Sequence, residues 1–252
     1  MTFLRHAIDL CADTLTRAQL SMQACVYISA YLRDMKVFLA FNRAYGAFFG
    51  TNPPARATVQ HGSPTLIMEV IGITRGSHVG LHVQSISDWA PACIGPYCQA
   101  QVTAINQHVM LIWLAGQIAL TPLTMTLEPA TPVMQLNTCW RHTTAVLTAV
   151  HRDHCSASQS RAVWTGGTLY LAQISATCDL VSELRNNLKE MVGSLAEHVM
   201  VLVAPELPRG AAVELKMTAC SLPLMVEDEG EDDTAENLPP ELTVHTGKCS
   251  VP

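Results

Sequence analysis

An internal repeat limits this chain to a fold built from two similar modules. Residues 4–8 (LRHAI) match residues 140–144 (WRHTT) at the start of two segments with helical spacing. Residues 67–70 match residues 212–215 near the end of each copy. A chain of 252 residues that repeats a pattern in this way is expected to hold two small domains rather than one large domain.

The segments between these matching ends are of the same kind and follow the same order. Residues 26–32 and 161–171 are rich in β-branched and aromatic side chains, which predicts strands. Residues 37–49 and 178–195 predict amphipathic helices. Further strands are predicted over residues 56–60, 66–74, 99–104, 108–114, 199–203 and 211–219, and helices over residues 1–24 and 132–150. The fold class is therefore α+β, and each complete module is expected to be a sheet with two helices on one face.

The module boundaries follow from these elements. We expect a first module over residues 1–76, a linker over residues 77–84, a second module over residues 85–225 and a disordered acidic tail over residues 226–252. The first module is expected to be truncated and to begin in mid-fold at Met1, so that its sheet would have an open edge.

The charge pattern excludes one large class of function. The formal net charge is −6, and Lys and Arg do not cluster anywhere along the chain. A nucleic-acid-binding protein needs a basic surface, so we expect no nucleic-acid partner. The longest apolar stretch, residues 109–123, is interrupted by Gly116, Gln117 and Pro122, so no membrane span is predicted either. Nine cysteines without a C-x-x-C pair, and an N-terminus unlike a signal peptide, indicate a cytoplasmic protein with reduced thiols.

Three short motifs carry a resemblance to a known family. They are IGPYCQA at residues 94–100, AGQIAL at residues 115–120 and PPARATV at residues 53–59. Through them the chain resembles the Rid family, also called YjgF or L-PSP endoribonuclease-like. In that family each motif occurs once and PPAR comes last, whereas here it comes first. The resemblance therefore implies the end of one Rid-like module followed by the start of another, with the chorismate-mutase-like α+β fold of the family.

The same resemblance implies a ligand pocket. Arg56 falls on the arginine with which Rid proteins bind the carboxylate of a small imino or keto acid, a task that suits a planar guanidinium. Asn42 falls on a pocket asparagine of the family, Tyr97 on the tyrosine that closes the pocket, and Glu69 on a glutamate that could position a water. We therefore predict Arg56 and Asn42 as substrate-binding residues, and Glu69 and Tyr97 as catalytic residues for imine hydrolysis. The alternative is structural: Asn42 caps or packs, Glu69 pairs with a basic neighbour, and Tyr97 is a core aromatic residue.

The second module departs from the family pattern. It keeps an acidic residue at Glu214, but its arginine position falls at about residues 198–199, where neither residue is arginine. The carboxylate clamp is therefore expected to be lost there. A complete pocket would need Arg56 to meet Tyr97 of the second module or of another chain, as in the trimers of the family.

Two other groups of residues could carry chemistry. Residues 151–155 (HRDHC) lack the paired spacing of zinc ligands, so a polar loop is expected and no metal is predicted. Cys93 and Cys98 flank the IGPY motif without a neighbouring His or Lys, so ordinary thiols are expected. The sequence contains no P-loop and no G-x-G-x-x-G motif, so no cofactor is predicted for this chain itself.

A longer match narrows the resemblance. Residues 83–100 are similar to the segment that joins two Rid-like modules in the diphthine–ammonia ligase family, and the resemblance covers roughly residues 1–225. In that family an ATP-pyrophosphatase-type domain precedes the two modules, and the enzyme uses ATP and ammonia to convert diphthine on elongation factor 2 to diphthamide. The resemblance implies ATP for the whole enzyme, elongation factor 2 as a partner, and either self-association or pairing with an ATP-pyrophosphatase domain.

Two functions therefore remain open from the sequence. In the first, the chain is the Rid-like part of a diphthine–ammonia ligase, without the nucleotide-binding domain, and serves assembly, ammonia handling or substrate docking. In the second, it is a free-standing deaminase of 2-imino or enamine acids. The expected loss of the arginine in the second module and of a hairpin in the first favours the ligase part.

Overall fold

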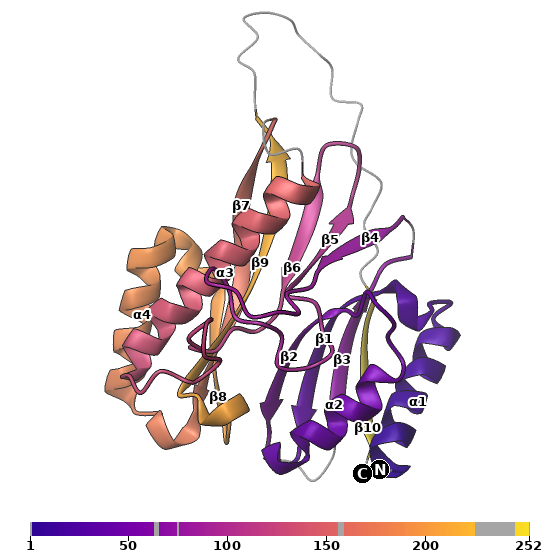
Figure 1. Ribbon diagram of the computed structural model, residues 1–252, viewed down its shortest axis with the longest axis horizontal. Coiled ribbons are helices and arrows are strands. Elements are labelled where there is room, and N and C mark those ends of the chain that lie inside the picture. The colour runs from indigo at the N-terminus through magenta and orange to yellow at the C-terminus, as the bar shows by residue number, and fades with distance from the viewer. Residues whose placement is uncertain (1, 63–65, 75, 156–158, 225–244, 252) are drawn as a thin grey trace, which may run out of the picture.

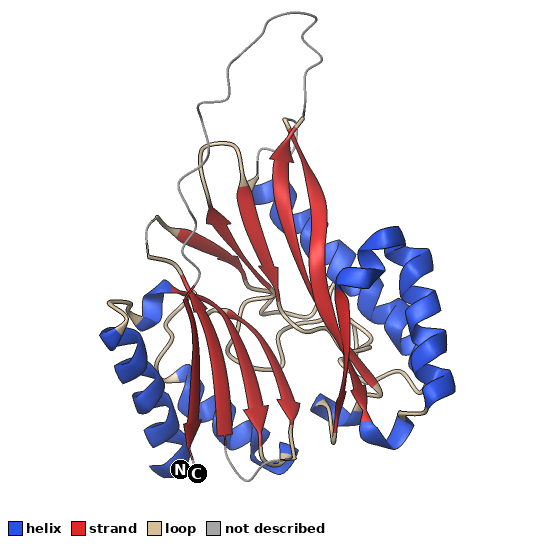
Figure 2. Ribbon diagram, turned by 180° about the vertical axis from the view of Figure 1, so that it is seen from behind, coloured by secondary structure: helices blue, strands red, loops and turns tan. Residues whose placement is uncertain are grey.

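The chain forms two β-sheets that each carry helices on one face (Figures 1 and 2). This computed structural model describes residues 2–62, 66–74, 76–155, 159–224 and 245–251. The helices lie on the outer sides of the molecule, and the two sheets lie between them (Figure 2). The predicted α+β class is confirmed. No helix within the described ranges is long and apolar enough to cross a bilayer.

The first module is built on a four-stranded sheet with the order β10-β3-β1-β2. Strand β1 is parallel to β2 and antiparallel to β3, which is in turn antiparallel to β10. Alternate side chains of β1 and β3 point to one face and form a core with the helices. The elements are α1 (Thr2–Arg17), β1 (Cys25–Leu32), α2 (Phe38–Gly46), β2 (Ala55–Gln60), β3 (Leu66–Gly72) and β10 (His245–Val251), with 3-10 turns at Met22–Ala24 and Met35–Val37.

The second module is built on a six-stranded sheet with the order β4-β5-β6-β9-β7-β8. Helix α3 starts where the Oγ1 atom of Thr131 accepts a hydrogen bond from the Met134 N–H at 3.3 Å, with Pro132 in the first turn. The elements are β4 (His78–Leu81), β5 (Ala100–Ala104), β6 (Met110–Leu114), α3 (Pro132–His154), β7 (Ser160–Ala172), α4 (Cys178–Val192), β8 (Val199–Ala204) and β9 (Val213–Pro223), with 3-10 turns at Gln173–Ser175, Gly193–His198 and Pro208–Gly210.

The internal repeat is visible in the strand pairing. The strands β6-β9-β7-β8 are joined by the same sequence of antiparallel and parallel pairs as β10-β3-β1-β2. The register equates individual residues, because Ser29 of β1 lies opposite Glu69 and Tyr170 of β7 lies opposite Glu214. Glu69 and Glu214 are therefore equivalent positions of the two modules, as the sequence repeat predicts.

The sheet faces that the helices leave uncovered pack against each other. Tyr27 and Ala57 of the first sheet and Tyr170 and Leu207 of the second module belong to one apolar cluster. Burial of apolar surface is the main favourable term in such contacts, so this cluster joins the two modules. Strand β2 is buried along its length up to Gln60, which places it between the modules.

The structure differs from the sequence prediction at the C-terminal end. Residues 226–252 were expected to be disordered, but residues 245–251 form β10, which pairs with β3 along seven residues. Residues 225–244 and 252 of that segment lie outside the described residues. The expected open edge of the first sheet is therefore paired at β3, where unpaired N–H and C=O groups would otherwise face solvent.

Two shorter predictions also need correction. Part of the expected linker, residues 77–84, is strand β4, which pairs with β5 and belongs to the second sheet. The expected polar loop at residues 151–160 begins instead with the last turn of α3, which continues to His154. The Nε2 atom of His151 lies 3.1 Å from the Oγ atom of Ser221, so this turn is tied to β9.

Candidate functional site

Arg56 lies on β2 at the junction of the two modules and is fully buried. Its Nη2 atom donates a hydrogen bond to the Oδ1 atom of Asn42 on α2 at 2.5 Å. Four aromatic rings surround the guanidinium, with centroids 4.6 to 6.0 Å from its Cζ atom: Tyr45, Phe41, Tyr97 and Phe38. Cation–π attraction of this kind holds an arginine without neutralising its charge.

The guanidinium of Arg56 still lacks an anionic partner. Its Nη1 atom is buried and has no hydrogen-bond partner, and the described residues give it no ion pair. Burial lowers the pKa of Arg56 from its ordinary value, because a charged group is less stable away from water. A buried and unpaired charge is costly, so the position is suited to an anionic ligand.

Tyr97 reaches Arg56 from the second module. Its hydroxyl oxygen accepts a hydrogen bond from the Ile94 N–H at 3.3 Å, which fixes the IGPY turn around the ring. The Asn42 side-chain amide donates to the Ile94 C=O at 3.5 Å, so α2 holds the same turn. Gly95 is required here, because a Cβ atom would lie 2.7 Å from Nη2 of Arg56. The structure thus brings Arg56 and Tyr97 into one pocket within a single chain.

Glu214 of β9 supplies the acidic group of this pocket. Burial raises its pKa to about 8, and the attraction of Arg56 and a hydrogen bond from the Thr58 backbone N–H oppose that shift. The Oε2 atom of Glu214 is buried without a partner. A Cβ atom on Gly116 would overlap Oε1 of Glu214, which explains the glycine of the AGQI motif. At neutral pH the carboxyl group is therefore mostly protonated and can donate a proton.

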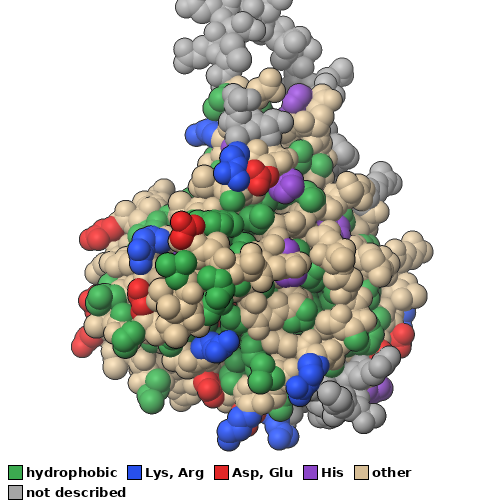
Figure 3. All heavy atoms as spheres, viewed as in Figure 1, with side chains coloured by type: hydrophobic (Ala, Val, Ile, Leu, Met, Phe, Trp, Pro, Cys, Tyr) green, Lys and Arg blue, Asp and Glu red, His purple; other side chains and the backbone are tan. Residues whose placement is uncertain are grey.

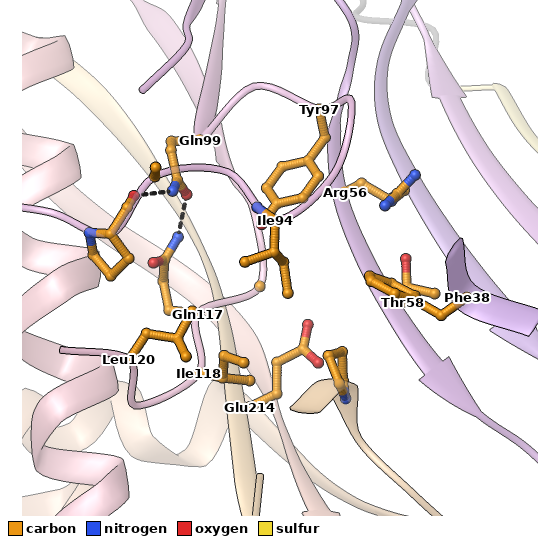
Figure 4. Close-up of a pocket in the computed structure, with 14 residues that line it drawn as sticks. Phe38, Arg56, Thr58, Ile94, Tyr97, Gln99, Gln117, Ile118, Leu120 and Glu214 are labelled. Carbon is orange, nitrogen blue, oxygen red and sulfur yellow. Dashed lines mark hydrogen bonds between the residues drawn. The ribbon is translucent and has the colours of Figure 1, made fainter. Parts of the chain in front are cut away.

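Between these groups is a small cavity, drawn in Figure 4 with its lining side chains. Its volume is about 30 Å³, which is room for one or two water molecules. Gln117 donates to Gln99 at 2.6 Å, and Gln99 donates to the Pro91 C=O at 2.8 Å, so this wall of the cavity is fixed. The apolar part of the lining consists of Phe38, Pro91, Ala92, Ile94, Ile118, Leu120 and Pro208.

Comparison with known proteins gives two curated relatives that match most of the chain. Diphthine–ammonia ligase of Schizosaccharomyces pombe is 28% identical over 207 residues, covering 79% of this chain and 32% of that protein. Diphthine–ammonia ligase of Saccharomyces cerevisiae is 27% identical over 253 residues, covering 88% of this chain and 35% of that protein. This chain is similar to diphthine–ammonia ligases. It spans about a third of the length of these ligases.

The family and structure comparisons add two findings. No protein-family model matches the chain. Among solved structures, the Rid family protein YyfA from Yersinia pestis is 21% identical with a TM-score of 0.42, and the match covers 57% of this chain and 98% of YyfA. The structural neighbours of this diphthine–ammonia ligase-like chain are thus Rid family proteins.

Glu69, predicted to be catalytic, does not line the cavity. It lies on β3, where the Tyr31 hydroxyl donates a hydrogen bond to its Oε2 atom at 2.9 Å. The carboxyl group in the cavity is instead that of Glu214, its equivalent in the second module. Strand β2, which carries Arg56, faces the second module. The carboxyl group that shares the cavity with Arg56 therefore comes from β9 of that module. The sequence shows Glu214 as an acidic residue of the second module, but no local pattern places it opposite Arg56.

The second module has no arginine at the position equivalent to Arg56. The register places Val201 there, because Ile28 pairs with Arg56 and Leu169 pairs with Val201. The expected position, residues 198–199, was therefore two residues too early. The expected loss of the clamp in the second module agrees with a valine at this place.

The other residues considered from the sequence lie in ordinary surroundings. Burial raises the pKa of Cys93 and of Cys98 to about 12 each, so both thiols are protonated and weakly nucleophilic. The described residues contain no group of three His, Cys, Asp or Glu side chains placed to hold a metal ion. His151, from the HRDHC segment, contacts the hydroxyl groups of Ser160 and Ser221.

Proposed function

We propose that this chain forms the part of a diphthine–ammonia ligase that binds a small carboxylate between two Rid-like modules. The supporting observation is Arg56, a buried guanidinium with one free nitrogen in a cavity that also contains Glu214. The similarity to two such ligases over most of the chain supports the assignment to this enzyme. In this proposal ATP, a nucleotide-binding domain and elongation factor 2 belong to the function of the whole enzyme.

The ligand is proposed to be a carboxylate because of what the pocket lacks. Asn42 occupies one guanidinium nitrogen of Arg56, while Nη1 has no acceptor among the described residues. A carboxylate would accept from Nη1 and neutralise the buried charge, which a neutral ligand could not do. The cavity of about 30 Å³ holds only one or two waters, so its walls must move apart to admit a carboxylate, and their apolar character favours a small molecule with a short apolar side chain.

The same geometry supports imine hydrolysis as a second candidate activity, because this one chain supplies both Arg56 and Glu214. With a 2-imino acid bound at Arg56, protonated Glu214 would donate its proton to the imine nitrogen. A water would add to the imine carbon, and the Glu214 carboxylate would take up a proton from it. Collapse of this adduct breaks the C–N bond and gives a 2-keto acid and ammonia. The name of the similar ligases also gives ammonia as a reactant.

The first experiment is a deamination assay with freshly generated 2-iminobutyrate and the purified chain. Wild type should accelerate ammonia release, and Arg56→Ala should abolish most of the acceleration. Loss of charge-assisted hydrogen bonds to a carboxylate is expected to weaken binding by about 10- to 100-fold. Arg185→Ala, which removes an exposed arginine of α4, is the matched control and should behave as wild type.

Binding is measured separately from turnover. Titration calorimetry with 2-ketobutyrate should show binding to wild type and much weaker binding to Arg56→Ala. Binding without turnover would reject the deaminase candidate and retain the carboxylate site. A folded wild-type chain that neither binds the keto acid nor releases ammonia would reject both.

A further inference from the structure

The cavity between the modules has an inner wall and a side that reaches solvent. On the inner wall, Arg56 and Glu214 are 2% and 3% exposed. Three other lining side chains are only partly buried, which places the entrance between α2 and the IGPY turn: Phe38, Ala92 and Ile94. Figure 4 shows Phe38 and Ile94 facing each other across the cavity, with Arg56 and Glu214 on the remaining sides.

The two sides of this entrance are held with different firmness. On the IGPY side, the Ile94 N–H donates to the Tyr97 hydroxyl at 3.3 Å, and the Ile94 C=O accepts from the Asn42 side-chain amide at 3.5 Å. On the other side, Phe38 is the first residue of α2, and Val37 before it makes no side-chain capping hydrogen bond. The first turn of a helix without such a cap is weakly constrained, so the Phe38 ring is the wall that can turn.

Phe38 also differs from the other rings of the first module that surround the guanidinium. The ring centroids of Tyr45 and Phe41 lie 4.6 and 5.2 Å from the Cζ atom of Arg56. Both of these residues are fully buried, and neither lines the cavity. The Phe38 centroid is farther away, at 6.0 Å. Turning the Phe38 ring would therefore enlarge the cavity while the closer cation–π contacts of Arg56 remain.

The space that Phe38 can release is limited. The cavity of about 30 Å³ has room for one or two waters, so a carboxylate at Arg56 needs the ring to move. The ring also packs against the apolar core of the first module, and close-packed cores allow only small displacements. Apolar sites of fixed size discriminate by side-chain length, with about 10- to 200-fold for each methylene group.

We propose that Phe38 sets the size limit of the ligand, so that the site takes 2-keto and 2-imino acids with short aliphatic side chains and excludes those with aromatic ones. This inference rests on the proposed function, because it requires that the carboxylate of the ligand binds at Arg56. Phe38 then acts on specificity, while Arg56 provides the affinity for the carboxylate that all these acids share.

The test is calorimetric binding of 2-ketobutyrate and of phenylpyruvate to the purified chain. Wild type should bind 2-ketobutyrate at least about 100-fold more tightly, and Phe38→Ala should reduce this ratio to about 10-fold or less. Leu39→Ala is the matched control, because Leu39 is the next residue of α2, is 68% exposed and does not line the cavity. An unchanged ratio in folded Phe38→Ala, or a wild type that binds both acids equally, would overturn this inference and leave the proposed function intact. A wild type that binds neither acid would overturn both.

Ile94→Ala gives a second readout from the other side of the entrance. The hydrogen bonds of Ile94 are made by its backbone, so the variant should keep the turn and also bind phenylpyruvate more tightly relative to 2-ketobutyrate. If Phe38→Ala does not fold, Phe38→Leu replaces it, since leucine keeps an apolar contact with the core but lacks the ring. In deamination of the two corresponding imines, both variants should change the ratio of KM values more than that of kcat values. Unchanged ratios in Phe38→Leu and Ile94→Ala would reject the inference.

Discussion

Arg56 and Glu214 line one cavity although they come from different sheets. The attraction of the guanidinium lowers the pKa of the carboxyl group, but burial outweighs it and the net shift is upward. The two groups are therefore not a simple ion pair at neutral pH. This relationship leaves the guanidinium free for a ligand and keeps a proton on the acid, which are the two requirements of the proposed chemistry.

The first prediction separates the two glutamates. Glu214→Gln should reduce deamination by about 10²- to 10⁴-fold, the usual contribution of a general acid, because the amide cannot deliver the proton. Binding of 2-ketobutyrate should be retained, since Arg56 is untouched. The measurements are the rate of ammonia release and calorimetric binding. Glu69→Gln is the matched control and should leave both unchanged; a larger rate loss from Glu69→Gln would assign the catalytic acid to β3.

The second prediction concerns the pH dependence of stability. The pKa of Glu214 is raised to about 8 in the folded protein, so the folded state holds a proton that the unfolded state releases near the ordinary carboxyl pKa. The free energy of unfolding should therefore fall as pH rises from the ordinary carboxyl range through about 8, by on the order of a few kcal/mol. Urea unfolding at several pH values should show this slope for wild type and a flatter one for Glu214→Gln. Equal slopes would show that Glu214 is ionised in the folded protein.

The third prediction tests the close approach of Gly116, in the AGQI motif, to the Glu214 side chain. In Gly116→Ala the new methyl group would overlap the Glu214 carboxylate, so β9 or the loop must move. Overpacking of this kind should lower the free energy of unfolding by about 1–3 kcal/mol. Gly50→Ala is the control, because its Cβ would meet nothing within 4 Å. Chemical denaturation of both variants provides the comparison, and equal stabilities would mean that the Glu214 side chain can turn away at little cost.

The fourth prediction concerns β10. Replacement of residues 245–251 by a Gly/Ser segment of equal length should remove the pairing with β3 and expose its edge. The variant should unfold at a lower denaturant concentration and aggregate more readily, with the second module less affected. Hydrogen exchange measures the protection of the backbone amides of each sheet separately. Unchanged protection of β3 in the variant would show that β10 does not stabilise the first sheet.

Local sequence patterns were sufficient for elements that are long or strongly apolar. Residues 26–32 predict β1 because they include Val26, Tyr27, Ile28 and Tyr31, which are aromatic or β-branched, and residues 132–150 predict most of α3. Strand β4 has four residues and β10 contains Gly247 and Lys248, so neither has a distinctive pattern. Each is defined by pairing with a neighbour, and for β10 that neighbour is far away in the sequence.

The sequence predicts only those residues of the pocket that a local motif or the family resemblance identifies. Arg56 and Tyr97 lie in recognisable motifs, and Asn42 falls on a pocket asparagine of the family that the chain resembles; the structure brings all three together. The choice between Glu69 and Glu214 depends on how the two sheets pack, which no local pattern records. The spacing of the aromatic residues Phe41 and Tyr45 predicts only a helix, yet their rings lie against the guanidinium of Arg56.

The position of β10 also sets an order in which the chain can fold during synthesis. The second sheet has all its strands once Pro223 has been made, whereas the first sheet waits for residues 245–251 to leave the ribosome. Domains generally fold as units during translation, so the second module should form while the first still presents a bare β3 edge to chaperones. The earlier-made half of the chain is thus the later one to finish folding.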